Sequence, residues 1–341
     1  MEKAPRPGKG RSGTRRRSPK SSAQQHRHTA PLSRGVPPGI IRVTALPTAV
    51  AFPPSVTPRF LRTMQYRLLA IDIDGTLVNS RDQLSDETKA ALAAARQAGI
   101  EVVLATGRRY ARALPLVQTL GLNVPLISAS GALVKRPMDH VTLYCASFEG
   151  DSLHRMLGLV ASAGYDAVLY ADTYHEDFDY YCVDINTTQP ELAEYFRKNP
   201  SRERVCPDLM SCPPPGIFAG FAMGTRPQMV ELAHHLHHHL PGAIETHVLR
   251  SPMYSGFMCE LLPAGTSKWA AISTLAHEWG IDPAEICAVG DDVNDIPMLQ
   301  GAGLGVAMGN ACDEVKAAAD RVTLCHDEHG VAEVVRWLLG D

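Results

Sequence analysis

The 341-residue chain is expected to form an α/β fold, a doubly wound parallel sheet with an inserted α+β domain. After residue 63, short apolar runs that end in polar loops alternate with helical stretches, a pattern typical of a parallel sheet covered on both faces. Between about residues 135 and 260 this pattern gives way to hairpin-like pieces with separate helices. We therefore expect a core of residues 64–134 and 261–341, and an inserted domain of residues 135–260, which is a usual domain size.

The segment before the core has a different composition. Residues 1–63 contain 13 Lys and Arg but a single acid, giving a net charge of +12, whereas the remainder has a net charge of −15. A basic stretch rich in Arg, Ser and Pro, without apolar periodicity, predicts disorder. Three interpretations of this segment remain open: a basic arm for a polyanion, an organellar targeting segment, or sequence upstream of a true start at Met64. Nucleic-acid binding is disfavoured because no aromatic residues are interleaved with the charges.

Composition also bears on the compartment. A hydrophobic content of 45% can support real cores, but no apolar run is long enough to span a bilayer, and prolines interrupt the semi-apolar stretch 36–56. The eight cysteines include no Cys-x-x-Cys pair and no zinc spacing. Such cysteines are typical of reduced thiols, so we expect a cytoplasmic protein without a membrane span.

The first element, LLAIDIDGTLV at 68–78, organises the rest. The apolar run 66–71 ends in Asp72-x-Asp74-Gly75, which predicts a buried strand with two carboxylates at its tip. Two such carboxylates could bind a hard cation, or serve as a nucleophile and its acid/base partner. The alternative is that they form only a solvated turn at the end of the strand. A helix then begins after Ser85, a good N-cap, and continues to about Ala98.

Two further units repeat the arrangement. A buried strand over 102–105 leads to Thr106 and Arg108, and a helix is expected over 110–120. A third strand, over 124–127, leads to Ser130. Because ligands of parallel sheets collect at the carboxyl ends of the strands, we expect these side chains to lie near Asp72.

The inserted region contains helices over 151–163 and 227–240 and strands near 167–170 and 217–223. Its polar stretch 173–184, TYHEDFDYYCVD, either faces the substrate or forms an exposed hairpin. The histidines of 234–239 include i,i+4 pairs that could chelate a transition metal, but no third ligand is evident. A polar helix face is the preferred interpretation of that cluster.

The chain then returns to the first pattern with a strand over 257–262. Lys268 follows in the first turn of a helix, where its charge opposes the helix dipole and suggests an electrostatic role. A strand over 286–289 ends in a loop with Asp291, Asn294 and Asp295. The remaining elements are expected to be two strands and a closing helix, over 304–307, 321–324 and 331–339.

Four carboxylates are thus predicted at one edge of the sheet: Asp72, Asp74, Asp291 and Asp295. At neutral pH they repel one another unless a cation binds or some of them are protonated. An oxygen-only ligand set suits Mg²⁺, which usually shares a substrate phosphate. With the hydroxyl of Thr106 and the charge of Lys268 available for that phosphate, the set predicts phosphoryl transfer.

At this point the motifs match a family. DIDGT at 72–76, ATGR at 105–108, Lys268 within GTSKWAA, and GDDVNDIPML at 290–299 resemble the four ordered motifs of the haloacid dehalogenase-like (HAD) hydrolases. AGLGVAMGNACDEVKAAADRVTL at 302–324 and HGVAEVV at 329–335 resemble the Cof-type branch, subclass IIB. The resemblance covers residues 66–339 and implies a Rossmann-like core with a C2-type α+β cap between the second and third motifs.

The resemblance also implies roles for individual residues. Asp72 would attack phosphorus and form an aspartyl-phosphate, and Asp74 would protonate the leaving alkoxide and then activate water. Mg²⁺ would be held by Asp72, the backbone carbonyl of Asp74, and Asp291, with Asp295 orienting the site. Arg108 would reach the phosphate or the leaving group. The phosphate oxygens would be held by Thr106, Lys268 and Asn294.

Two positions depart from the branch. Ser130-Gly131-Ala132 stands where Asn-Gly-Ala is common, and Trp269 follows Lys268 where glycine is usual. Neither departure is expected to touch the core chemistry, but both bear on the shape of the substrate pocket.

The expected function is therefore a Mg²⁺-dependent phosphatase acting on a small phosphorylated metabolite such as a sugar phosphate. A phosphosugar mutase of the phosphomannomutase type would use the same groups, although the Cof-like ending favours hydrolysis. A non-catalytic polyanion-binding protein that kept the fold is the third possibility, disfavoured because every catalytic group is present.

Overall fold

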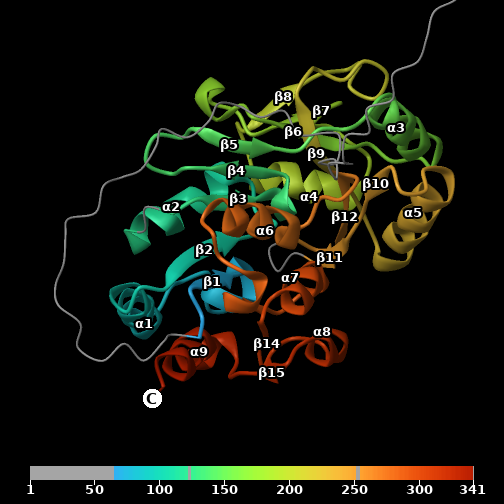
Figure 1. Cartoon of the computed structure of the whole chain (residues 1–341). Coiled ribbons are helices and arrows are strands. Elements are labelled where there is room, and N and C mark those ends of the chain that lie inside the picture. The colour runs from blue at the N-terminus through green and yellow to red at the C-terminus, as the bar shows by residue number, and fades with distance from the viewer. Residues whose placement is uncertain (1–64, 122–123, 251–253, 341) are drawn as a thin grey trace, which may run out of the picture. The chain divides into compact units, whose positions relative to one another are not determined.

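The computed structural model describes residues 65–121, 124–250 and 254–340, which lie in one compact unit (Figure 1). The interpretations of the basic segment 1–63 and of a start at Met64 lie outside the described residues. Across the described ranges, no helix combines the length and apolar character needed to cross a bilayer.

The first sheet has eight strands in the order β15-β14-β13-β1-β2-β3-β4-β5. Neighbouring strands from β15 to β3 are parallel, and β4 and β5 add an antiparallel hairpin. This arrangement confirms the expected doubly wound sheet. Because β1 lies between β2 and β13, its carboxyl end is at the switch point where such sheets bind ligands. The strands are β1 (Leu68–Ile71), β2 (Glu101–Ala105), β3 (Leu126–Ser128), β4 (Leu133–Lys135), β5 (Thr142–Cys145), β13 (Ile286–Gly290), β14 (Leu304–Ala307) and β15 (Arg321–Val322).

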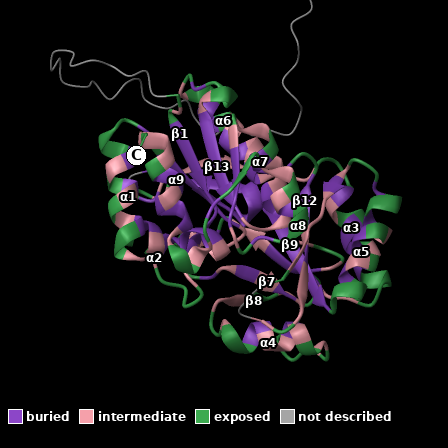
Figure 2. Cartoon of the chain, turned by 90° about the horizontal axis from the view of Figure 1, so that it is seen from below, coloured by how far each residue is buried: buried purple, intermediate pink, exposed green. Residues whose placement is uncertain are grey.

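Helices cover both faces of this sheet. Along β1, Leu69 and Ile71 pack on one side, and Leu68 and Ala70 on the other, because successive strand residues point to opposite faces. The strands are consequently buried throughout, as Figure 2 shows for β1 and β13. One face is covered by α1 (Asp86–Gln97), α2 (Tyr110–Leu120) and α9 (Gly330–Leu339), and the other by α6 (Lys268–Glu278), α7 (Ile296–Gly301) and α8 (Asp313–Ala318).

The second sheet runs in the order β10-β12-β9-β6-β7-β8, with β11 also paired to β12. Its pairs are antiparallel except for β7 with β8. Helices α3 (Ser152–Ser162) and α5 (Arg226–His239) pack on one face, and α4 (Pro190–Lys198) packs on the other. The strands are β6 (Val168–Ala171), β7 (Tyr180–Cys182), β8 (Glu203–Val205), β9 (Ile217–Gly224), β10 (Ile244–Glu245), β11 (Val248–Arg250) and β12 (Phe257–Pro263).

Strand β12 differs from its expected place. We expected residues 257–262 to resume the parallel sheet, but β12 pairs antiparallel with β9 in the second sheet, with Glu260 opposite Phe221. A short, mostly apolar strand fits either sheet, so its composition does not reveal its partner. Strand β5 conversely belongs to the first sheet although it lies beyond residue 135. The ranges assigned to core and inserted domain stay a prediction.

Candidate active site

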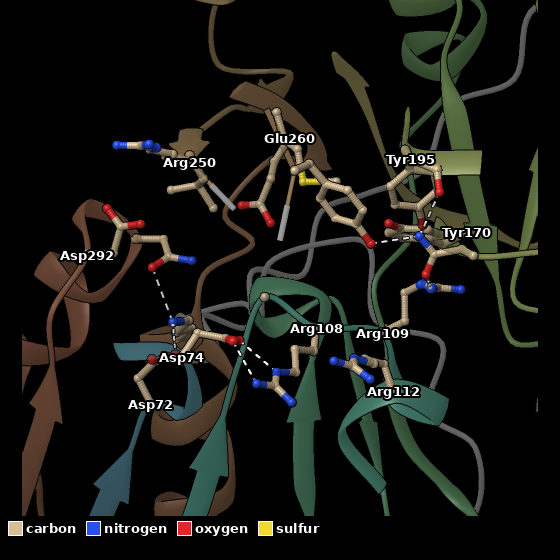
Figure 3. Close-up of a pocket in the computed structure, with 17 residues that line it drawn as sticks. Asp72, Asp74, Arg108, Arg109, Arg112, Tyr170, Tyr195, Arg250, Glu260 and Asp292 are labelled. Carbon is tan, nitrogen blue, oxygen red and sulfur yellow. Dashed lines mark hydrogen bonds and ion pairs between the residues drawn. The ribbon is translucent and has the colours of Figure 1, made fainter. Parts of the chain in front are cut away.

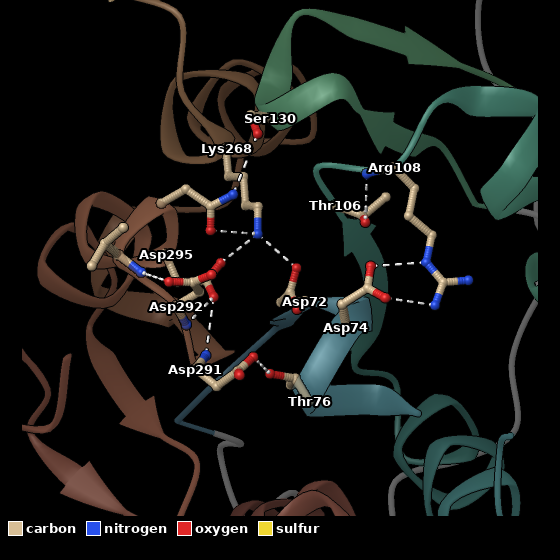
Figure 4. Close-up of polar contacts among 12 residues, drawn as sticks. Asp72, Asp74, Thr76, Thr106, Arg108, Ser130, Lys268, Asp291, Asp292 and Asp295 are labelled. Carbon is tan, nitrogen blue, oxygen red and sulfur yellow. Dashed lines mark hydrogen bonds and ion pairs between the residues drawn. The ribbon is translucent and has the colours of Figure 1, made fainter. Parts of the chain in front are cut away.

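Polar side chains gather where β1, β2, β3 and β13 end, as expected (Figure 4). Asp72 follows β1 and is only 4% exposed, and its backbone N–H donates to the Val289 carbonyl, 3.0 Å away. The Thr106 side chain is fully buried and accepts a 3.0 Å hydrogen bond from the backbone N–H of Arg108. The fold thus collects residues that are far apart in the sequence around one buried carboxylate.

Lys268 is the cation beside that carboxylate. Ser267 caps α6 by accepting from the backbone N–H of Ala270, so Lys268 begins the helix. Its Nζ donates to Asp72 Oδ1 and Asp295 Oδ1, each at 2.6 Å. Burial alone would lower the pKa of Lys268, but Asp295 and Asp72 together raise it above its usual value. Lys268 is therefore charged at neutral pH and balances part of the acidic cluster.

Asp72, Asp291 and Asp295 each offer a carboxylate oxygen, and these three oxygens lie within 4.8 Å of one another. Thr76 Oγ1 donates to Asp291 Oδ1 at 2.8 Å. A Cβ on Gly75, whose φ is +74°, would overlap the Asp291 carboxylate, so this approach requires glycine.

Burial and the neighbouring Asp295 raise the pKa of Asp291 to about 8, and burial raises the pKa of Asp72 well above its usual value despite Lys268. Crowded, buried carboxylates of this kind bind a proton or a cation readily. Their oxygen-only donors fit a hard divalent cation such as Mg²⁺.

Asp295 holds the loop that supplies this cluster. Its Oδ2 accepts from the backbone N–H groups of Asp291, at 3.0 Å, and Asp292, at 3.1 Å. Its other oxygen accepts from Lys268. Asp295 therefore orients both the acid and the cation around Asp72.

Asp74 faces a different partner. Arg108 donates two hydrogen bonds to the Asp74 carboxylate, from Nε to Oδ2 at 2.8 Å and from Nη2 to Oδ1 at 2.7 Å. Arg108 also contacts Asp82. The Asp74 side chain is 39% exposed, whereas that of Asp72 is 5% exposed. The two acids of the first motif therefore occupy different environments, one accessible and one buried.

Ser130 lies beside the site, after the end of β3, where we expected it. Its Oγ donates to Glu260 Oε1 at 2.7 Å and accepts from Asn294 Nδ2 at 3.3 Å. The loop after β3 lies against the start of α6, which places Ser130 beside Asn294. Trp269, in contrast, packs in the apolar cluster beneath α6 and α7 and does not line the pocket described next.

A cavity of about 160 Å³ opens beside Asp72 and Asp74 (Figure 3). Asp72, Asp74 and Arg108 line one side. The second sheet, α4 and the segment before β12 contribute the other side, including Tyr170, Tyr195, Tyr254 and Glu260. Sequence reasoning missed these residues because they come from separate elements and share no motif.

Two polar stretches lie outside this cavity. Within 173–184, β7 is an inner strand between β6 and β8, with Tyr180 and Cys182 buried, and no residue of the stretch lines this cavity. On α5, His237 Nε2 lies 2.9 Å from Thr246 Oγ1, and His239 Nδ1 lies 2.9 Å from the His235 carbonyl. The role of the cluster 234–239 stays a prediction.

Comparison with known proteins gives consistent matches. Residues 69–335 match the family model of the haloacid dehalogenase-like hydrolases. Phosphatase YwpJ of Bacillus subtilis is 31% identical over 293 residues, covering 80% of this chain and 100% of that protein. Pyridoxal phosphate phosphatase YbhA of Escherichia coli is 26% identical, covering 80% and 98%.

The fold is similar to solved structures as well. The HAD subclass IIB sugar phosphatase BT4131 has a TM-score of 0.65 at 23% identity, over 80% of this chain and 99% of that one. At that identity the likeness shows the fold alone. The family match and the YwpJ alignment show that this chain is an enzyme belonging to the haloacid dehalogenase-like hydrolases, as a phosphatase of the Cof-type branch.

Proposed function

We propose that this chain is a Mg²⁺-dependent phosphatase that hydrolyses small phosphomonoesters through an aspartyl-phosphate on Asp72. The observation that carries the proposal is the position of Asp72, buried between Lys268 and the acids Asp291 and Asp295. A carboxylate becomes a useful nucleophile towards phosphorus when nearby positive charge holds and neutralises the phosphate.

Mg²⁺ held by Asp72, Asp291 and the backbone carbonyl of Asp74 would neutralise phosphate charge and relieve the repulsion among the acids. Asp72 forms a bond from a carboxylate oxygen to phosphorus while the bond from phosphorus to the leaving oxygen breaks. Lys268, Thr106 and Asn294 hold the phosphate oxygens during this exchange, since positioning and charge neutralisation supply most of the catalysis.

Asp74 is proposed to transfer the protons of both steps, as a general acid and then as a general base. Because its carboxyl is exposed to the cavity, it can give a proton to the leaving oxygen and then accept one from the water that hydrolyses the aspartyl-phosphate. Arg108 keeps the carboxyl in place through its two hydrogen bonds.

The substrate is expected to be a small phosphorylated metabolite, sugar phosphates among them. The names of the relatives support this range, because one is a pyridoxal phosphate phosphatase and one fold neighbour is a sugar phosphatase. A cytoplasmic location is also proposed, supported by eight cysteines that are all free thiols.

The test is phosphate release from a panel of phosphorylated metabolites, with and without Mg²⁺. Asp72→Asn should abolish Mg²⁺-dependent release. With the wild-type protein, any sugar phosphate that remains should be the one added and not an isomer of it. Unchanged release by Asp72→Asn would refute the nucleophile. Accumulation of an isomeric sugar phosphate without free phosphate would instead indicate a mutase.

A further inference from the structure

Glu260 reaches the groups around Asp72 from the second sheet. It belongs to β12, yet its Oε1 accepts a 2.7 Å hydrogen bond from Ser130 Oγ, in the loop after β3 of the first sheet. Its Oε2 lies 3.0 Å from His247 Nδ1, and its backbone N–H donates to the His247 carbonyl at 2.8 Å. The Glu260 side chain is only 12% exposed. Glu260 is therefore held in one position where the two sheets meet.

The chemistry of these groups gives the hydrogen bonds a direction. An ionised carboxylate only accepts hydrogen bonds, so Ser130 gives its single hydroxyl hydrogen to Glu260. The lone pairs of Ser130 Oγ remain, and they accept from Asn294 Nδ2 at 3.3 Å. Lys268 Nζ, which only donates, lies 3.2 Å from Asn294 Oδ1. The amide of Asn294 is thus oriented from both ends.

This orientation leaves one amide hydrogen of Asn294 available. Among the described residues, Nδ2 gives one hydrogen to Ser130 and the second has no partner. Asn294 is 5% exposed and lines the same cavity as Asp72. A phosphate bound at Asp72 can accept the second hydrogen, whereas a reversed amide would present an oxygen to the phosphate and repel it.

The same polar atoms converge on the loop after β2. A Cβ on Gly107 would lie 3.4 Å from Ser130 Oγ, 3.6 Å from Glu260 Oε1 and 3.7 Å from Asn294 Nδ2. Gly107 directly follows Thr106, which is proposed to hold a phosphate oxygen. The hydrogen bonds that begin at Glu260 therefore end beside the proposed phosphate site.

We propose that Glu260 is a positioning residue for the phosphate site: through Ser130 it orients the amide of Asn294 so that Nδ2 faces the phosphate. The proposal rests on the proposed phosphatase function, and it gives the second sheet a part in holding the phosphate. Because Glu260 acts as an acceptor for Ser130, another acceptor at this position can replace it.

The first test is the hydrolysis of p-nitrophenyl phosphate at saturating Mg²⁺. In Glu260→Ala, kcat/KM should fall about tenfold, because the Ser130 hydroxyl becomes free to donate to the amide oxygen of Asn294. Glu260→Gln, whose amide oxygen can still accept from Ser130, should recover most of this loss and stay within about threefold of wild type. The control Glu176→Ala, at an exposed carboxylate that pairs with Arg204, should match wild type.

A double-mutant cycle shows whether Glu260 acts through Asn294. Once Asn294→Ala has removed the amide, adding Glu260→Ala should lower kcat/KM by less than about twofold. Equal losses with and without the amide, or equal losses in Glu260→Ala and Glu260→Gln, would overturn the positioning role. If Glu260→Ala does not fold, Ser130→Ala, which removes the acceptor of the amide directly, enters the same cycle with the same expected result.

Binding of inorganic phosphate to the Mg²⁺-loaded protein, measured by calorimetry, separates positioning from turnover. Phosphate affinity should fall about tenfold in Glu260→Ala, and this loss should disappear when Asn294 is alanine. That result in a protein that releases no phosphate from any ester would support the positioning role and defeat the proposed function. Mg²⁺-dependent release that is lost in Asp72→Asn, with additive effects of Glu260→Ala and Asn294→Ala, would keep the function and defeat the positioning role.

Discussion

Ser130 Oγ lies 2.7 Å from Glu260 Oε1, and this hydrogen bond joins the loop after β3 in the first sheet to β12 in the second. Ser130 also accepts from Asn294 Nδ2, and Lys268 Nζ donates to Asn294 Oδ1 at 3.2 Å and to Asp72 at 2.6 Å. A continuous series of hydrogen bonds therefore runs from the second sheet to the proposed nucleophile.

Replacing Ser130 should weaken both the fold and the chemistry. In Ser130→Ala, Glu260 loses a donor and Asn294 loses an acceptor in a mostly buried position, so unfolding free energy should fall by about 1–3 kcal/mol, with a lower kcat. Urea unfolding and kcat measure the two effects. The exposed Ser211, which donates only to the Asp208 carbonyl, gives the control Ser211→Ala, expected within about 0.5 kcal/mol of wild type. Equal stability of the two variants would contradict this expectation.

Stability should depend on pH through His247. Burial alone lowers its pKa, but the hydrogen bond and charge of Glu260 raise it above the usual value. Since the folded state holds this proton more tightly than the unfolded chain, the contribution is complete below about pH 6.5 and is lost as pH rises through the folded pKa.

The measurement for His247 is unfolding free energy of wild type and His247→Gln between pH 5.5 and 8.5. The advantage of wild type should shrink with rising pH by on the order of 1 kcal/mol. An advantage that stays constant across this range would show that the His247–Glu260 pair is not the titrating element.

Arg108 is expected to act through the placement of Asp74. Lysine keeps the charge but cannot make the paired contacts of 2.8 and 2.7 Å, so Arg108→Lys should lower kcat about tenfold to a hundredfold. Steady-state kinetics at saturating Mg²⁺ provides the readout. Arg336→Lys, at a half-exposed arginine paired with Glu333, is the matched control and should behave like wild type. A kcat unchanged in Arg108→Lys would argue against this placement role.

Removal of Asp291 should separate stability from metal binding. Wild type should gain about 2.7 kcal/mol from Mg²⁺ at a hundred times its Kd, and chelation should reverse that gain and abolish activity. Asp291→Asn should lose the gain and the activity, yet be at least as stable as wild type without metal, because one of three crowded carboxylates is neutralised.

The control for Asp291 is Asp313→Asn, at an exposed acid in the first turn of α8, which should retain the response to Mg²⁺. Thermal unfolding with and without Mg²⁺ provides the comparison. A full Mg²⁺ response in Asp291→Asn would place the metal elsewhere.

Gly131 should tolerate no side chain. Its φ is +100°, and a Cβ would overlap the Ser267 carbonyl directly before Lys268. Gly131→Ala should therefore destabilise the protein by several kcal/mol, on the order of 3 or more, and displace Lys268. Gly265→Ala has a φ of +71° but open space around its Cβ, so it should cost only about 1 kcal/mol. Similar denaturation midpoints for the two variants would contradict the overlap.

Local patterns predicted much of the fold. The strand and helix expected around Asp72 and Ser85 are present as β1 and α1, with Ser85 accepting from the Thr88 N–H as an N-cap should. The order of strand-end motifs also predicted the family. Such features depend on burial periodicity, capping and turns within a few neighbouring residues, so they can be recognised in a short stretch of sequence.

The positions of the candidate catalytic groups were predictable for a related reason. Asp72, Thr106 and Asp291 each follow a strand of one parallel sheet, and parallel strands bring their carboxyl ends to the same edge. Their chemical roles stay predictions until the variants are measured.

The pocket could not be predicted in the same way. Ser130 and Glu260 are 130 residues apart, and their contact exists because β12 pairs with β9 rather than with a strand of the first sheet. Tyr195 and Tyr254 likewise meet only through the packing of α4 and the approach to β12. Strand partners and the meeting of distant loops are set by long-range burial and hydrogen-bond pairing summed over the whole molecule. The candidate catalytic acids can therefore be recognised from neighbouring residues, whereas the shape and polarity of the cavity wall opposite them arise only when the two sheets pack together.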